Sequence, residues 1–333
     1  MKFLIAGLGS IGRRHFRNLL QLGERDITLL RSHQSTLQDD ELAGFPVETD
    51  LNKALASNPD AVIISNPSAL HLPVAMAAVQ AGCHIFLEKP VAHSHDGTKE
   101  LLQAVEQQKV VAAVGFQFRF HPGLRAAYDL IQQNRLGKIL SASAYWGEYL
   151  PGWHPWEDYR KGYAARQDLG GGVVRTLCHP LDYLSWMFGR VQTVSASVLA
   201  TGILDIAVDD LAEIDLSFAG GAQGHVHLDY HRKPGKHTLT IVGTAGTLEW
   251  DNATGIMQYI LAGESQWHSI MPPAEFERNT MFLKEMQNFI HAIKETELPS
   301  CSLEEGIFNM QVIDAVYRAA ETGCKIDLLE MNP

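Results

Sequence analysis

The chain has 333 residues, of which 46% are hydrophobic and 20% charged, a composition typical of a globular protein with two domains. Its 27 lysine and arginine residues are outnumbered by 38 aspartate and glutamate residues, so the formal net charge is -11. This charge argues against nonspecific binding to nucleic acid or to an anionic membrane, because either partner needs a basic surface. Small anionic ligands are not excluded, since they need only a local positive site.

The four cysteines, Cys83, Cys178, Cys301 and Cys324, are scattered and form no CxxC pair, so we interpret them as free thiols. The apolar run at the N-terminus is too short for a signal peptide and passes directly into a glycine-rich turn. No window approaches the roughly 20 apolar residues of a membrane span. The sequence therefore predicts a cytoplasmic protein with neither a membrane nor a nucleic-acid partner.

A glycine-rich turn follows the first apolar run and precedes a stretch of helical composition. It has the GxGxxG spacing in the strand–turn–helix context that gives this motif its meaning. The first glycine permits a tight turn, the second lets the backbone approach a pyrophosphate, and the third allows the helix to pack close to the strand. The free N–H groups and the positive end of the helix dipole favour phosphate. The predicted dinucleotide site includes Gly7, Gly9, Ser10, Ile11 and Gly12.

The end of the second predicted strand bears on the choice of cofactor. NAD-specific sites usually have an acidic residue about 20 residues past the glycines, where it accepts a hydrogen bond from the ribose 2′-hydroxyl. Here Arg31 lies 19 residues past Gly12, with Ser32 beside it. Arginine and serine can bind a 2′-phosphate, which a carboxylate would repel. We therefore predict NADP as the preferred cofactor; the alternative is that Arg31 only stacks on adenine and NAD binds equally well.

Strand-like and helix-like segments alternate along the first 120 residues. The predicted strands are residues 3–6, 27–30, 61–65, 83–87 and 110–114, and the predicted helices are residues 13–22, 70–81 and 97–107. The strands are continuously apolar, as in a parallel sheet that is buried on both faces. We therefore predict an α/β fold in which residues 1–120 form an N-terminal Rossmann domain with a doubly wound parallel sheet.

The predicted strand at residues 83–87 leads directly into Glu88, Lys89 and Pro90. Open α/β sheets bind ligands at the carboxyl ends of their strands, so this position suits a reacting lysine. Lys89 would hydrogen-bond the reacting oxygen, and Glu88 would position Lys89 or contact the nicotinamide ribose. We also expect the Lys89–Pro90 bond to be cis. The alternative is a surface ion pair followed by a turn proline.

Several of these motifs occur together in one known family. Asn66-Pro67, His71 and Glu88-Lys89-Pro90, behind the amino-terminal GxGxxG, resemble the glucose–fructose oxidoreductase / inositol dehydrogenase / MocA (Gfo/Idh/MocA) family. Residues 115–120, which include Gln117, are similar to its domain-junction motif. The resemblance implies a Rossmann domain followed by an α/β domain with a large open sheet. It also implies NAD(P)-dependent redox chemistry on a pyranose or cyclitol, and a homodimer or homotetramer packed through that sheet.

The resemblance adds residues to the predicted cofactor site. Asn66, Pro67 and Gln117 lie in the shared motifs, so we include them together with Glu88 and Lys89. His71 lies in the first turn of the helix that follows Asn66-Pro67, near the expected position of a dinucleotide. It could contact the cofactor or the substrate, and a purely structural role is an equal alternative.

From residue 121 onward the pattern changes to strands that alternate with turns. The strands are predicted at residues 139–146, 191–200, 211–218, 224–230, 238–242, 246–250 and 255–260. We predict that residues 121–333 form an α+β domain with a large, mostly antiparallel open sheet, which helices at residues 276–295 and 303–322 cover. This domain would bind the substrate and mediate oligomerisation. Its His225, His227, His231 and His237 lack the companions of a metal site, so we predict surface or interface histidines and no metal.

Residues 147–167 are rich in aromatic and basic side chains. Aromatic faces stack on sugar rings, and arginine binds carboxylate or phosphate groups through paired hydrogen bonds. We therefore predict that Trp156, Tyr159 and Arg160 contact the substrate. The alternative is a loop that covers hydrophobic surface between the domains.

One further helix is predicted over residues 173–187, in which Arg175, His179 and Asp182 share a face. His179 matches the histidine that the family carries here, whereas Arg175 stands where the family usually has an aspartate. An arginine near His179 disfavours imidazolium and leaves a neutral base. We predict that His179 is the general acid/base and that Arg175 and Asp182 contact a sugar, which could be anionic, such as a uronate or a nucleotide sugar. The opposite interpretation is that the site has lost the usual chemistry.

Together these features predict an NAD(P)-dependent oxidoreductase that moves a hydride between nicotinamide and a ring carbon of a sugar or sugar derivative. Lys89 and His179 are the predicted catalytic residues. Two alternatives stay open. One is a redox-type glycoside hydrolase that uses NAD without net turnover, and the other is a catalytically silent, NADP-binding regulator.

Overall fold

The computed structural model describes residues 1–32 and 40–329, which form two compact units. The first unit consists of residues 1–117 and 277–310, and the second takes in residues 118–276 and the chain from residue 311 onward. The predicted division placed everything after residue 120 in one domain. Residues 277–310 instead belong to the first unit, so the chain passes from one unit to the other three times.

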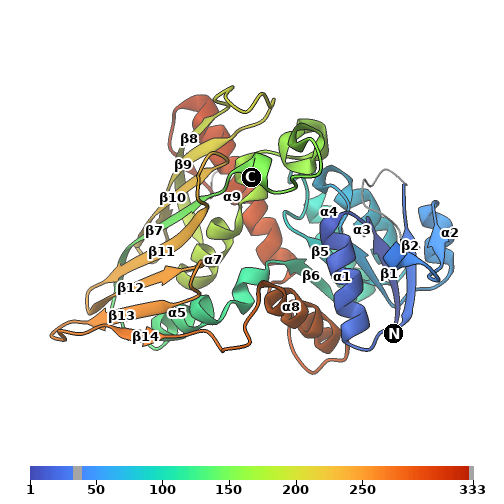
Figure 1. The fold of residues 1–333 in the computed structure, drawn as a ribbon, viewed down its shortest axis with the longest axis horizontal. Coiled ribbons are helices and arrows are strands. Elements are labelled where there is room, and N and C mark those ends of the chain that lie inside the picture. The colour runs from blue at the N-terminus through green and yellow to red at the C-terminus, as the bar shows by residue number, and fades with distance from the viewer. Residues whose placement is uncertain (33–39, 330–333) are drawn as a thin grey trace. The chain divides into compact units, whose positions relative to one another are not determined.

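The first unit is built on a six-stranded sheet with the strand order β3-β2-β1-β4-β5-β6, in which all neighbours are parallel (Figure 1). This is the order of a doubly wound dinucleotide-binding fold, so the predicted Rossmann architecture is confirmed. Strand β4 is buried along its whole length, and β1 is buried except at its first residue, Lys2, as their apolar sequences predict. The strands are β1 (Lys2–Ala6), β2 (Asp26–Leu30), β3 (Val47–Glu48), β4 (Ala61–Ile64), β5 (His84–Glu88) and β6 (Ala112–Gly115).

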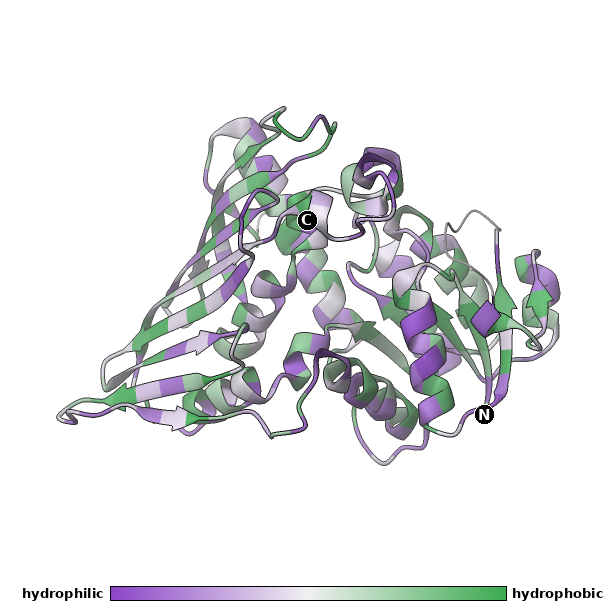
Figure 2. Cartoon of the chain, viewed as in Figure 1, coloured by the Kyte–Doolittle hydropathy of each residue, from purple (hydrophilic) through white to green (hydrophobic). Residues whose placement is uncertain are grey.

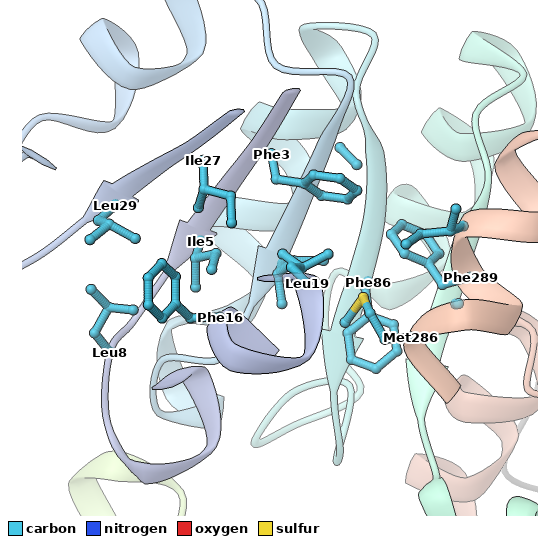
Figure 3. Close-up of a cluster of buried hydrophobic side chains, with 14 of the residues drawn as sticks. Phe3, Ile5, Leu8, Phe16, Leu19, Ile27, Leu29, Phe86, Met286 and Phe289 are labelled. Atoms are coloured by element: carbon cyan, nitrogen blue, oxygen red, sulfur yellow. The ribbon is translucent and has the colours of Figure 1, made fainter. Parts of the chain in front are cut away.

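The helices of the first unit cover this sheet. They are α1 (Ser10–Gln21), α2 (Leu51–Ala56), α3 (His71–Gln80), α4 (Thr98–Gln108), α8 (Arg278–Ile293) and residues 303–310 of α9 (Leu303–Thr322). Helix α8 contacts α1, and its Met286 and Phe289 join Phe3 and Phe86 in one buried cluster (Figure 3). The expectation that α8 covers the antiparallel sheet was therefore wrong. Its apolar face identifies a covering helix but does not reveal which sheet it covers.

The second unit contains a nine-stranded sheet with the order β14-β13-β12-β11-β7-β10-β9-β8-β15. Only β7 and β10 run parallel among its neighbouring pairs, so the predicted mostly antiparallel sheet is confirmed. Buried and accessible residues alternate along β9 and β10, as expected of a sheet with one covered face. Figure 2 shows hydrophobic and hydrophilic residues interspersed along the strands of this sheet. The strands are β7 (Ile139–Gly147), β8 (Val191–Leu199), β9 (Leu211–Phe218), β10 (Gln223–Asp229), β11 (Lys236–Gly243), β12 (Gly246–Asp251), β13 (Met257–Leu261), β14 (His268–Ile270) and β15 (Ile326–Asp327).

Helices α5 (Pro122–Gln132), α6 (Val173–Thr176) and α7 (His179–Phe188) pack on one face of this sheet (Figure 1). The single helix predicted over residues 173–187 is wrong, because the chain breaks between α6 and α7. Pro180 explains the break, since its ring has no N–H and collides with the carbonyl group one turn earlier. Arg175 therefore lies on a different helix from His179, and the predicted common face of Arg175, His179 and Asp182 does not exist.

The aromatic segment at residues 147–167 has little regular structure. After β7 ends it forms only short 3₁₀ turns, at Leu150–Gly152, Tyr159–Lys161 and Tyr163–Ala165. Among residues 1–32 and 40–329, no helix has the length and apolar character needed to cross a membrane.

Candidate functional site

The glycine-rich turn between β1 and α1 has the geometry of a phosphate cradle. Gly7 has a φ of +94°, and a Cβ atom there would lie 2.5 Å from the backbone nitrogen of Asn66. A Cβ atom on Gly12 would lie 2.0 Å from the carbonyl oxygen of Gly7, so both positions require glycine. By contrast, the space in front of Gly9 is open, and both Gly9 and Ser10 are exposed at the N-terminus of α1. These features fit a dinucleotide pyrophosphate.

The end of β2 lies beside this turn. The N–H group of Gly7 donates a hydrogen bond to the carbonyl oxygen of Leu30 (3.3 Å), the residue before Arg31. The N–H group of Arg31 in turn donates to the carbonyl oxygen of Glu48 (2.9 Å), which fixes the backbone there. The Arg31 side chain is largely buried, and Ser32 is exposed. The position suits the adenosine ribose, and the preference for NADP stays a prediction.

His71 joins two segments of the predicted cofactor site. It is buried, its Nε2 atom lies 2.8 Å from the carbonyl oxygen of Asn66, and its Nδ1 atom lies 3.0 Å from that of Pro90. Burial lowers the pKa of His71. Both ring nitrogens face backbone carbonyl groups, and a contact of His71 with the cofactor or the substrate stays a prediction. His71 holds the Asn66-Pro67 turn against the segment that contains Pro90.

Lys89 follows β5 at the carboxyl edge of the parallel sheet and is partly accessible. The Lys89–Pro90 peptide bond is cis, as the sequence predicts. Glu88 is buried, and its Oε2 atom accepts a hydrogen bond from the backbone N–H of Lys89 (3.3 Å). Its Oε1 atom lies 2.6 Å from Nε2 of His15 in α1. His15 was not among the predicted site residues; its only signal in the sequence is a polar residue beside Phe16 on the buried face of α1.

The neighbouring strand β6 also bounds the space around the Glu88 carboxyl group. Gly115 is the register partner of Glu88, and a Cβ atom on Gly115 would lie 3.3 Å from the Glu88 carboxyl group. Gln117 follows β6 and is buried. Its predicted contact with the cofactor stays a prediction.

His179, the first residue of α7, belongs to the second unit and lies among aromatic rings. Its ring is edge-on to Phe118 at a centroid distance of 4.9 Å and tilted against Trp146 at 5.5 Å. Only 2% of His179 is exposed. The same cluster holds His237, which stacks on Trp146 at 4.3 Å. His237 was predicted at the surface or an interface; this prediction is wrong because an inward position on β11 places it in the core.

Arg175 lies in α6, where its guanidinium group is 4.4 Å from the centroid of the Tyr317 ring. Asp209 connects these elements: it accepts hydrogen bonds from the Tyr317 hydroxyl and from the backbone N–H of Val174, both at 3.0 Å. Burial raises the pKa of Asp209, and the positive charge of Arg175 opposes this shift. Asp209 thus connects Val174, the residue before Arg175, with Tyr317, and the sequence did not reveal this carboxyl group.

Asp182 forms a buried ion pair with Arg119, another residue of the second unit. Oδ1 of Asp182 accepts a hydrogen bond from Nη2 of Arg119 (2.7 Å), and Oδ2 accepts one from Nε (3.1 Å). The two side chains are only 2% and 3% exposed. A carboxylate held in this way anchors α7 to the start of the second unit, and the contact of Asp182 with the substrate stays a prediction.

The predicted substrate residues of the aromatic segment lie near its surface. Trp156 is 66% exposed, and the Tyr159 hydroxyl donates to the carbonyl oxygen of Leu204 (2.8 Å). Arg160 is paired with Asp158 and Asp205. A surface pocket adjoins these turns, and it is lined by Arg160, Ala165, Arg166, Gln167, Asp168, Asp205, Ile206 and Ala207.

Comparison with known families covers nearly the whole chain. Residues 1–116 match a family model described as the NAD-binding Rossmann fold of an oxidoreductase family. Residues 129–328 match the model of the same family's C-terminal alpha/beta domain. The two matches correspond to the parallel and the mostly antiparallel sheets of the structure.

Individual relatives agree with these matches. The chain is 27% identical to a D-xylose 1-dehydrogenase (NADP⁺) of Haloferax volcanii, over 98% of this chain and 100% of that protein. It is 26% identical to a 1,5-anhydro-D-fructose reductase of Ensifer adhaerens, over 84% and 86% of the two chains. Among solved structures, a levoglucosan dehydrogenase in complex with NADH superposes with a TM-score of 0.88, at 21% identity, over 98% of this chain and 99% of that one.

Proposed function

Because the chain belongs to the Gfo/Idh/MocA family of oxidoreductases, we propose that it transfers a hydride reversibly between a nicotinamide dinucleotide, preferably NADP, and a ring carbon of a sugar derivative. The observation that carries this proposal is the position of Lys89. It follows β5, two strands from the glycine-rich turn after β1, at the same carboxyl edge of one parallel sheet. The names of the two curated relatives support a sugar as the substrate.

The first unit would hold the cofactor, which supplies the hydride chemistry when bound. The N–H groups at Gly9 and Ser10 would bind the pyrophosphate, because they are exposed at the start of α1. Arg31 and Ser32 would bind the 2′-phosphate of NADP. Lys89 would donate a hydrogen bond to the reacting oxygen and stabilise the negative charge that develops on it.

His179 is the proposed general acid/base in the second unit. It would remove the proton from the substrate hydroxyl during oxidation and return it to the oxygen during reduction. Arg175 would select a substrate with a negative charge, such as a uronate or a nucleotide sugar.

The test is a panel of neutral sugars, uronates and nucleotide sugars assayed with NADP and NAD. We expect turnover with at least one sugar class, and we expect Lys89→Met to abolish it while Arg175→Asp shifts the preference towards neutral sugars. Absence of turnover with every substrate and both cofactors would contradict the proposed function. If neutral sugars react best and Arg175→Asp changes nothing, the anionic substrate is refuted while the dehydrogenase is retained.

We also propose a cytoplasmic homodimer or homotetramer. The four free cysteines support a reducing compartment. Glu213, His225 and His227 lie on the face of the nine-stranded sheet opposite the one packed by α5 and α7, and this face offers a surface for a second copy. Sedimentation of the purified protein tests the assembly, and a monomer at micromolar concentration would refute it.

A further inference from the structure

His15 and Glu88 form a buried contact that none of the roles above uses. The Nε2 atom of His15 lies 2.6 Å from Oε1 of Glu88, and their side chains are 0% and 9% exposed. The His15 ring is held edge-on to Phe86 at 5.1 Å and to Phe282 at 6.5 Å. Its Nδ1 atom is buried and has no hydrogen-bond partner within the part of the chain that the structure describes. Among the described residues, the His15 ring therefore makes its hydrogen bond to Glu88.

This contact fixes the carboxyl group that precedes Lys89. One oxygen of Glu88 faces His15, and the other accepts from the backbone N–H of Lys89. On the β6 side, the missing side chain of Gly115 leaves room for the carboxyl group, since a Cβ atom there would approach it to 3.3 Å. Glu88 is thus held on three sides, and a short hydrogen bond to a carboxylate is among the stronger polar contacts in a protein.

Helix α1 connects this contact with the phosphate cradle. The helix begins at Ser10, directly after the open position at Gly9, and His15 lies on its buried face. A helix is a rigid element, so the phosphate end of the cofactor site and the strand end at Lys89 share one support. We propose that His15 is a positioning residue that acts through Glu88 to hold Lys89 in its productive orientation. This inference rests on the proposed function, in which Lys89 contacts the reacting oxygen.

Three substitutions separate the hydrogen bond from the packing of the ring. His15→Gln places an amide N–H near the position of Nε2 and keeps the bond to Glu88. His15→Asn places its amide near the position of Nδ1, from which it cannot reach Glu88. His15→Phe keeps the ring between Phe86 and Phe282 and loses the donor. The asparagine and glutamine variants are matched in chemistry, so their difference reports the bond even if the phenylalanine variant fails to fold.

We expect His15→Asn and His15→Phe to lower kcat about 10- to 100-fold, the scale of a small misplacement of a reacting group, with little change in the Kd of NADPH. His15→Gln should recover most of kcat. In the Glu88→Leu background, which has no acceptor for Nε2, His15→Phe should have no further effect on kcat, because the partner of His15 is already lost. A purely structural His15 would lower Tm in all three variants alike, and its effect would add to that of Glu88→Leu. Equal activity of the glutamine and asparagine variants, or additivity, would overturn the inference.

A second readout does not depend on turnover. The fluorescence of bound NADPH reports the surroundings of the nicotinamide ring near Lys89. We expect its emission to match the wild type in His15→Gln and to differ in His15→Asn. If no sugar is turned over but this pattern holds, the proposed function fails and the positioning role of His15 stands. If both variants match the wild type, the positioning role fails.

Discussion

Arg119 and Asp182 form a buried, two-bonded ion pair within the second unit, with Nη2 of Arg119 2.7 Å from Oδ1 of Asp182. Removing one partner of such a pair leaves an uncompensated buried charge. We therefore expect Asp182→Ala to lower the free energy of unfolding by about 3–5 kcal/mol. Denaturant unfolding measures the change.

The exposed pair of Arg125 and Asp129 provides the control for Asp182→Ala. Nε of Arg125 lies 3.6 Å from Oδ1 of Asp129, and the two side chains are 55% and 51% exposed. Asp129→Ala should therefore change the free energy of unfolding by less than about 1 kcal/mol. If Asp182→Ala left stability unchanged and instead raised KM for the sugar, Asp182 would be the substrate contact that the sequence predicted.

Lys89 offers the most direct test of the chemistry. Lys89→Met keeps the length and apolar stem of the side chain and removes its charge. We expect kcat to fall about 10²- to 10³-fold, as when one donor to a developing oxyanion is lost. The Kd of NADPH and Tm should change little. Lys99→Met, at an exposed position of α4, is the control and should retain full activity. Full turnover by Lys89→Met would remove Lys89 from the mechanism.

Substitution of Arg31 tests the proposed preference for NADP over NAD. If its guanidinium group binds the 2′-phosphate, Arg31→Ala should raise the Kd of NADP about 10- to 100-fold. This factor corresponds to the free energy that a hydrogen bond to a charged group contributes. The Kd of NAD, which lacks this phosphate, should stay within about threefold on the same scale. Calorimetric titration with both cofactors measures the two values. Equal weakening of NADP and NAD would show that Arg31 stacks on adenine instead.

His121 makes the second unit sensitive to acid. It caps α5 by accepting a hydrogen bond from the backbone N–H of Gly123 (3.1 Å), and burial lowers the pKa of His121 to about 4. The unfolded value is about 6.5. Between these values the unfolded state binds a proton that the folded state does not. Through this residue alone, the free energy of unfolding should therefore fall by about 1.4 kcal/mol for each pH unit between about 6.5 and about 4.

The variant His121→Asn isolates this contribution. Its amide oxygen can still cap α5, but the side chain does not titrate. We expect the variant to be less stable at neutral pH, because it lacks the ring that contacts Trp250 and Phe276. We also expect its free energy of unfolding to fall less steeply than that of the wild type as the pH falls. Denaturant unfolding at several pH values compares the slopes. Equal slopes for the variant and the wild type would show that His121 takes up its proton over the same pH range in the folded and the unfolded state, and would contradict the lowered pKa.

The sequence predicted the features that depend on local chemistry. The glycine-rich turn, the buried parallel strands and the cis Lys89–Pro90 bond were read correctly, because each depends on adjacent residues. The break between α6 and α7 could also have been predicted, since Pro180 stands inside the expected helix. Reading the segment as one helix followed its apolar composition and overlooked the proline.

Other features depend on which distant segments meet. Arg119 and Asp182 are 63 positions apart, so no local pattern indicates their pairing. Asp209 is likewise distant in sequence from Val174 and Tyr317, whose hydrogen bonds it accepts, so no local pattern indicates these contacts either. The packing of α8 was missed for a related reason, because an amphipathic helix reports that it covers a core but does not identify that core.

The return of the chain to the first unit has a consequence for its synthesis. Met286 and Phe289 complete the core around Phe3 and Phe86, yet the ribosome makes them after almost the whole second unit. A fragment that ends at residue 120 would lack these two side chains and leave the apolar surface beneath them in water. The parallel sheet therefore cannot finish folding as the chain emerges; it must wait, partly uncovered, for residues 277–310.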